Sequence, residues 1–168
     1  MTVSMTALTL RQPWASLISS GGKLFESRTW APPVPLIGQR IAIHAGKSKI
    51  SNGLSDEELA AIRSGLDADD LAALPRGMIV CTARIAGAYR VGAFCGTSNR
   101  ITFDDRVAGS PTVDNIVVPA SERFLSDVLP GYWLWQLVEA GRFTPPVPAT
   151  GRLGLWRWTS DPSHRPPT

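Results

Sequence analysis

Cysteine is scarce in this sequence, with only Cys81 and Cys95 among 168 residues. Two cysteines provide neither a disulfide framework nor the ligand set of a structural zinc site. Cys81 lies inside an apolar run, where a cysteine usually acts as a small buried hydrophobe and not as a nucleophile. The sequence also lacks any cluster of potential metal ligands at a suitable spacing. We therefore predict neither a metal site nor a cofactor.

Long hydrophobic runs are missing as well. No stretch approaches the roughly 20 apolar residues that a membrane-spanning helix requires. The first ten residues lack a positively charged start followed by a long apolar stretch, so a secretory signal is not expected. These absences predict a protein without membrane association and with a cytoplasmic location.

The length and composition fit one folded domain. Hydrophobic residues make up 43% of the chain, which is enough for a core and argues against a disordered protein. A chain of 168 residues has little room for a second independent core. We predict a single domain over residues 1–160, followed by a frayed tail at 161–168.

Positive charge is concentrated in the N-terminal third. Residues 1–52 carry six lysine and arginine side chains against a single acid, Glu26, although the net charge of the whole chain is only +3. A concentrated positive field attracts partners that carry phosphate. A solvated charged face without a partner is the alternative interpretation. Here the cations coincide with aromatic residues and glycines, which favours a binding site.

Short strands separated by glycine- and proline-rich turns predict an α+β fold, a small mixed β-barrel with two or three helices packed against it. Apolar alternation predicts strands at 5–10, 23–30, 39–45, 78–89, 132–138 and 153–158. Helices are predicted from Pro13 to the glycines at 21–22, after the capping box that starts at Ser55, and over 67–74. Residues 92–130 are predicted as loops, with short strands near 101–103 and 115–118.

One segment places chemically active residues close together. Lys23, Glu26 and Arg28 follow a glycine turn within eight residues. In a regular strand Glu26 and Arg28 share one face with Trp30. A lone acid among cations is expected to be ionised, so Glu26 can order the cations or accept hydrogen bonds from a base edge. An ion pair that only shapes the strand is the competing interpretation.

The order of these motifs resembles the ASCH domain family, which belongs to the PUA-like group of small β-barrels. The resemblance rests on residues 12–18 (QPWASLI), on the spacing Gly21-x-Lys23-x-x-Glu26-x-Arg28, and on residues 41–47 (IAIHAGK). It extends through the strand at 77–85 and the closing segment at 148–158, and so covers most of the chain. The resemblance implies a PUA-like barrel with a basic cleft beside the first helix, lined by Lys23, Glu26 and Arg28. It also implies binding of RNA or nucleotides.

The residue types at this place fit such a ligand. Lys23 is a point charge suited to phosphate, and Arg28 offers a planar fork for phosphate or a guanine edge. Trp14 and Trp30 can stack on a base, a contact worth about 1–3 kcal/mol. For Trp14, packing in the core is the favoured alternative.

A second strand end adds three candidates. His44 is a potential acid–base group, although a plain hydrogen-bonding role within the fold is the favoured interpretation. Backbone amides near Gly46 can hold a phosphate, with Lys47 beside them. The complete predicted ligand site is Trp14, Lys23, Glu26, Arg28, Trp30, His44, Gly46 and Lys47. The expected partner is RNA, another single-stranded nucleic acid, or a nucleotide or nucleoside.

Two other functions stay open. Some ASCH-like proteins are enzymes, and one branch hydrolyses an acylated cytidine with a lysine, a threonine three residues later and a separate glutamate. Here Lys23 is kept, but Glu26 stands where that threonine would be. Ribonuclease activity is also associated with some members. In an enzyme, Lys23 and Glu26 would be the catalytic residues. A protein-interaction domain that uses residues 92–130 is the third hypothesis.

Overall fold

The computed structural model describes residues 2–66, 71–161 and 163–164, and shows a mixed α+β architecture built on one large sheet. The strands are β1 (Val3–Leu10), β2 (Phe25–Arg28), β3 (Arg40–Ala45), β4 (Met78–Cys95), β5 (Arg100–Arg106), β6 (Asn115–Val117), β7 (Trp133–Pro148) and β8 (Leu155–Ser160). The helices in this part of the chain are α1 (Trp14–Ser20), α2 (Asp56–Gly65) and α3 (Glu122–Leu125), with short 3₁₀ turns at Val34–Leu36 and Leu71–Ala73. None of these helices has the length and apolarity needed to cross a membrane.

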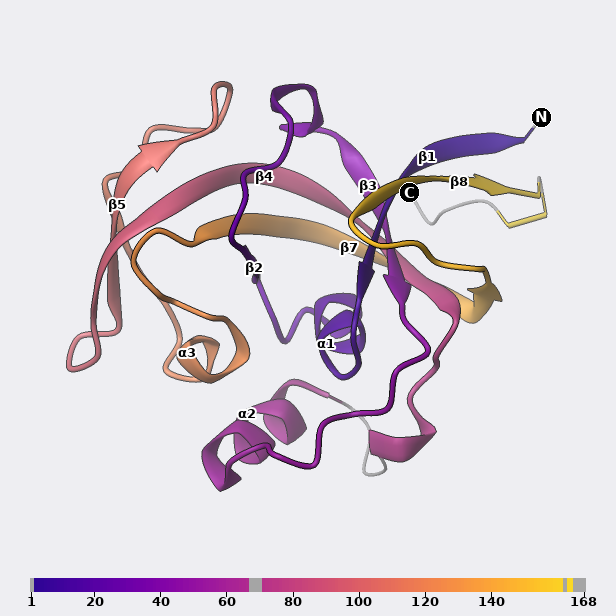
Figure 1. The fold of residues 1–168 in the computed structure, drawn as a ribbon, viewed down its shortest axis with the longest axis horizontal. Helices are drawn as coiled ribbons and strands as arrows, with labels where there is room; N and C mark the ends of the chain where they lie inside the picture. The colour runs from indigo at the N-terminus through magenta and orange to yellow at the C-terminus, as the bar shows by residue number, and fades with distance from the viewer. Residues whose placement is uncertain (1, 67–70, 162, 165–168) are drawn as a thin grey trace.

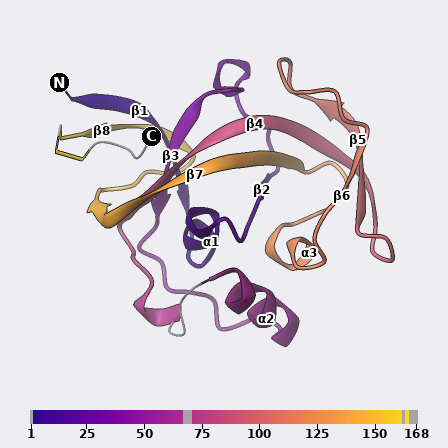
Figure 2. The ribbon, with the colours of Figure 1, turned by 180° about the vertical axis from the view of Figure 1, so that it is seen from behind.

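Two long strands give the sheet its shape. β4 and β7 arc over α1, with β1, β3 and β8 gathered at one end and β5 at the other (Figure 1). The reverse view shows β6 beside β5 at that second end (Figure 2). The β4–β7 ladder shifts register at three places, and such irregularities bend and twist a strand pair. The sheet therefore curves around the first helix.

The sheet is curved but not closed. Its strand order is β2-β7-β4-β3-β1-β8, with β5 and β6 attached beside β4. β2 and β8 stand at the two ends of this order, and no pairing joins them within the described residues. The α+β class predicted from the sequence is confirmed, whereas closure into a barrel is not.

Apolar side chains fill both faces of the sheet. The main core lies between α1 and the sheet, and Ile18, Ile43 and Trp135 are almost completely inaccessible there. A second core on the opposite face of β3 contains Ala42 and Trp158. The alternation predicted for residues 39–45 is confirmed, because neighbouring residues of β3 serve different cores.

The first helix is held by side chains that the sequence pattern did not identify. The Gln12–Pro13 peptide is cis, and the helix begins at Trp14, one residue later than predicted. Gln12 precedes the N-cap residue Pro13 and binds the first turn: its Oε1 accepts a hydrogen bond from the Ser16 amide at 3.1 Å, and its Nε2 donates to Pro75 O at 2.6 Å. Gly21 ends the helix with a φ of 79°, as the glycine pair predicted.

Several element bounds differ from the sequence-based expectation. The strand predicted over 23–30 spans only Phe25–Arg28. β4 runs on to Cys95, and β7 continues to Pro148 through two prolines. Prolines are tolerated there because β2 pairs only with residues 133–136 of β7, so the strand beyond has one unpaired edge.

The segment 92–130 is more ordered than predicted. It contains the last part of β4, the two expected strands as β5 and β6, and the unpredicted helix α3. Of the helix predicted over 67–74, residues 71–73 form a 3₁₀ turn, and residues 67–70 lie outside the described residues. Residues 162 and 165–168 also lie outside them, so the division into a domain and a tail stays a prediction.

The two cysteines occupy opposite environments. Cys81 is completely buried in the main core, as its apolar context predicted. Cys95 is exposed at the end of β4. Groups of three or more potential metal ligands are not found among the described residues.

Candidate functional site

Two adjoining cavities lie beside α1 and the short strand β2. Cavity A, of about 270 Å³, is bounded by α1, β2, the start of α2 and the α3 segment. Cavity B, of about 370 Å³, extends from β2 to the ends of β1 and β3 and to the loop before β8. Trp14, Glu26 and Ser27 line both cavities. We refer to the two cavities together as the cleft.

Lys23 lines cavity A, but its ammonium group is hydrogen-bonded within the fold. Only 3% of the residue is exposed. Its Nζ donates to Leu125 O at 2.6 Å, to Ser126 Oγ at 2.7 Å and to Phe25 O. Burial lowers the pKa of Lys23, while the nearby carboxylates act in the opposite direction. All three ammonium protons have protein acceptors, so a ligand would have to displace one of them.

Glu122 is a buried residue beside the cleft that the sequence analysis missed. It is 2% exposed, and its carboxylate accepts hydrogen bonds from Phe25 N at 3.1 Å, Leu24 N at 3.2 Å and Ser126 Oγ at 2.8 Å. The side chain thereby replaces a neighbouring strand along the outer edge of β2. The spacing of Glu122 and Ser126, one helical turn apart, is a signal for a helix here, but the composition of residues 92–130 predicts loops.

Glu26 and Arg28 form an ion pair at the junction of the cavities. Arg28 Nε lies 3.0 Å from Glu26 Oε1, and Arg28 Nη2 donates to Thr9 O at 3.2 Å. Burial raises the pKa of Glu26, while Lys23 and Arg28 pull it down. The predicted sharing of one strand face by Glu26 and Arg28 is confirmed by this contact. Arg28 is partly exposed and lines cavity B.

The family follows from a comparison over most of this chain. A model of the ASCH domain matches residues 8–146, a span that contains all eight predicted site residues. The chain belongs to the ASCH domain family. A search of curated proteins finds no match.

Charge is divided unevenly along the cleft of this ASCH domain. Cavity A is lined by two cations and three carboxylates: Lys23, Arg123, Glu26, Glu58 and Asp127. Cavity B is lined by Arg11 and Arg28 against Glu26 alone. The positive character expected for the whole cleft is therefore limited to cavity B, and cavity A has mixed charge.

His44 has the plain hydrogen-bonding role that its sequence context favoured. It is 2% exposed and is not among the residues that line the cleft. Nε2 lies 3.1 Å from Ala149 O and must carry the proton, since a carbonyl only accepts. Nδ1 then accepts from Thr9 Oγ1 at 3.3 Å, and that hydroxyl accepts from Trp156 Nε1 at 3.0 Å. Burial lowers the pKa of this histidine, so the ASCH domain holds it neutral.

The remaining predicted residues divide between the cleft and the rest of the surface. Trp30 packs edge-on against Trp135, with ring centroids 4.9 Å apart, and does not line the cleft. Lys47 lies along Gly77 and also falls outside the cleft lining. Gly46 lines cavity B, but its amide already donates to Leu10 O at 2.8 Å. The ASCH domain thus brings together Trp14, Lys23, Glu26, Arg28 and Gly46.

Proposed function

We propose that this ASCH domain binds one nucleotide unit of single-stranded RNA, or a free nucleotide, in the cleft. The observation that carries the proposal is the change of charge along the cleft at a shared tryptophan. Mixed-charge cavity A and net-positive cavity B meet at Trp14 and at the Glu26–Arg28 pair. A site with a polar recognition half and a cationic half suits a molecule made of a base and a phosphate. We also propose that the curved sheet belongs to the PUA-like group of folds. We further propose that the protein is located in the cytoplasm.

The cationic half supports contact with phosphate. Arg28 uses Nε and Nη2 within the fold, and Nη1 has no protein hydrogen-bond partner among the described residues. Arg11 is exposed on the same cavity. Two guanidinium groups at one cavity can hold a phosphate through charge-assisted hydrogen bonds.

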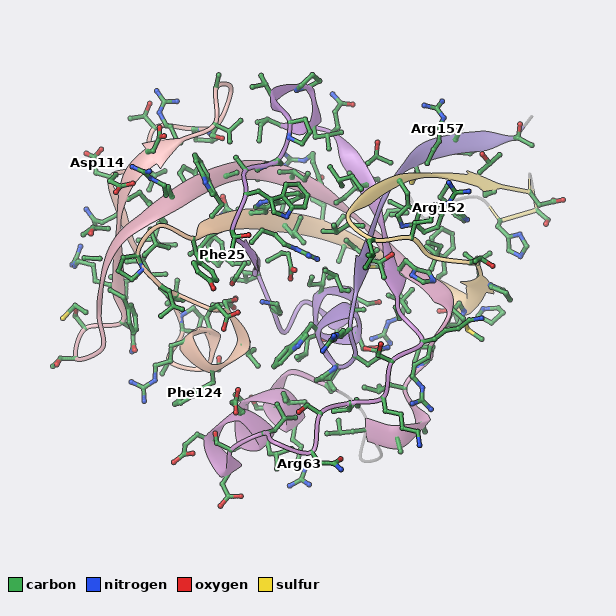
Figure 3. The ribbon with its side chains drawn as sticks, in the orientation of Figure 1. Phe25, Arg63, Asp114, Phe124, Arg152 and Arg157 are labelled. Atoms are coloured by element: carbon green, nitrogen blue, oxygen red, sulfur yellow. The ribbon has the colours of Figure 1, made fainter. Side chains whose placement is uncertain are left out.

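An apolar residue beside cavity B supports contact with a neighbouring nucleotide. Leu153 is 98% exposed and lines the cavity from the loop before β8. Arg152, next to it, lies on the same loop at the β8 end of the molecule (Figure 3). A leucine in full solvent contact does not stabilise the fold by burial, so its surface is available to a ribose or a base.

The direct test is fluorescence anisotropy with a labelled single-stranded RNA and calorimetry with the four nucleoside monophosphates. We expect RNA to bind, and the logarithm of the binding constant to fall linearly with the logarithm of the salt concentration. The slope should be roughly −0.7 for each phosphate that the protein contacts. Absence of binding to every probe at low salt would contradict the proposal.

A hydrolase acting on an acylated nucleoside is the second candidate. The observation that favours it is the position of Lys23 and Glu26 on one cavity, with burial lowering the pKa of the lysine and raising that of the glutamate. The three protein acceptors around Nζ weigh against a reactive amine. Release of carboxylic acid from N-acylated nucleosides, lost in Lys23→Ala and Glu26→Gln, would favour this candidate. No release over a broad panel would exclude it.

A further inference from the structure

β2 is an edge strand, and the hydrogen-bond pattern fixes which of its main-chain groups face outward. Leu137 N donates to Leu24 O at 2.9 Å, and the register pairs Phe25 with Gln136 and Ser27 with Leu134. In an antiparallel ladder, successive residues direct their N–H and C=O groups to opposite sides. The odd-numbered residues of β2, Phe25 and Ser27, therefore direct theirs away from β7.

The contacts of Phe25 confirm this orientation. Its N–H donates to Glu122 Oε1 at 3.1 Å, and its C=O accepts from Lys23 Nζ. Glu122 and Lys23 thus satisfy the first outward pair of β2. Buried main-chain N–H and C=O groups almost always have a hydrogen-bond partner.

Ser27 carries the next outward pair, and it lies at the junction of cavities A and B. Among the described residues, neither a side chain nor a further strand forms a hydrogen bond with the outward-facing main-chain N–H or C=O of Ser27. A residue that lines the cleft therefore presents a donor and an acceptor side by side on the outer edge of β2, and Trp14 lines the same two cavities.

We infer that the main-chain N–H and C=O of Ser27 bind the Watson–Crick edge of an unpaired base. This inference rests on the proposed function. Each of the four bases has a hydrogen-bond acceptor next to a donor on that edge, so one base can make the two bonds that a partner strand would make. The edge is free only in a single strand, so the contact selects unpaired nucleic acid and leaves base identity open.

An extended peptide fits this edge less well. α3 covers Phe25, and β2 ends at Arg28, so only one outward residue is free. Peptides that add a strand to a sheet derive affinity from a row of main-chain hydrogen bonds. A single pair suits a base, and the arginines of cavity B suit the phosphate attached to it.

The first test compares a methyl group at two different positions of the same base. We compare uridine monophosphate, its 3-methyl form and its 5-methyl form by calorimetry on the full chain. The 3-methyl group blocks the Watson–Crick edge, whereas the 5-methyl group has similar size but lies on another edge. We expect the 3-methyl form to bind about 30-fold more weakly than uridine monophosphate, and the 5-methyl form to bind equally.

Equal binding of both methylated forms would overturn the inference while leaving the proposed function in place. Failure of the unmodified nucleotide and of the other three monophosphates to bind would overturn the proposed function and the inference together. A labelled extended peptide that binds, and is not displaced by nucleotide, would also overturn the inference.

The second test removes the donor from the protein. Ser27→Pro deletes an N–H that faces away from β7, a position at which an edge strand tolerates proline. Val117→Pro, on the exposed edge strand β6 and outside the cleft lining, is the matched control. We expect nucleotide binding to fall about tenfold in Ser27→Pro and to be unchanged in Val117→Pro. If Ser27→Pro misfolds, amide exchange of Ser27 in the wild type decides: ligand must slow it, and an unchanged rate overturns the inference.

Discussion

The carboxylate of Glu122 accepts a hydrogen bond from the main-chain amide of Phe25 at 3.1 Å, across 97 residues of sequence. This bond joins α3 to the outer edge of β2, and the residues that follow Glu122, at 123–127, line cavity A. The cleft therefore depends on a buried carboxylate that does not itself line it.

Loss of this carboxylate is expected to destabilise the fold. Glu122→Ala leaves the buried amide of Phe25 and the partly buried amide of Leu24 without an acceptor and removes one of the carboxylates near Lys23, at a cost of about 3 kcal/mol. Urea denaturation followed by circular dichroism measures it. The matched control is Asp104→Ala, which removes an exposed ion pair with Arg90 and should cost much less. Equal effects of the two variants would contradict a special role for Glu122.

Acid is expected to weaken the fold through His44. Burial lowers the pKa of this side chain from its ordinary value of 6.5, so the unfolded chain binds its proton before the folded chain does. The stability associated with neutral His44 is thus complete above pH 6.5 and is lost as the pH falls below it. Urea titrations from pH 7.5 to 5 measure the slope. His44→Gln should flatten it, whereas His164→Gln, at an exposed position, should not.

Removal of a cavity B cation is expected to weaken RNA binding and its dependence on salt. Arg11→Ala should lower the salt slope by roughly 0.7 if Arg11 contacts one phosphate. Arg63 is exposed on α2 and does not line the cleft, so Arg63→Ala is the charge-matched control (Figure 3). Anisotropy titrations at several salt concentrations compare them. Identical slopes for the two variants would place the phosphate elsewhere.

The two N-terminal tryptophans are expected to differ in their effect on binding. Trp14→Leu keeps an apolar side chain on α1 but removes the stacking surface, which should reduce RNA affinity by about 1–3 kcal/mol. Trp30 packs on Trp135 away from the cleft lining, so Trp30→Leu should leave affinity unchanged. Equal losses in both variants, measured by anisotropy after confirming their folding, would show that the ligand extends beyond the cleft.

Local sequence patterns predicted the elements that depend on local chemistry. The Ser55–Glu58 capping box forms as expected, with each side chain bonded to the backbone of the other residue. Gly21 closes α1, and the two-residue spacing of Glu26 and Arg28 gives an ion pair on one face. These features need only neighbouring residues, and sequence spacing therefore determines them.

The role of Lys23 could not be predicted in the same way. The spacing identified it as a ligand-binding cation, but its acceptors at Leu125 and Ser126 lie about 100 residues away. No local pattern encodes such a contact, which arises only when α3 packs against β2. The extension of β7 through Pro145 was missed for a similar reason, because proline is acceptable there only through the absence of β2 and the bulge opposite β4, where the register passes from Arg142 to Val147.

The opposite environments of the two cysteines make this protein suited to selective labelling. Burial raises the pKa of Cys81 to about 12, whereas hydrogen bonds from Ser98 and Thr97 lower that of exposed Cys95. The thiolate is the reactive form, so a maleimide dye at neutral pH will attach to Cys95 and spare Cys81. Cys95 is not among the residues lining the cleft, so the native chain offers a single attachment point for a fluorophore outside that lining.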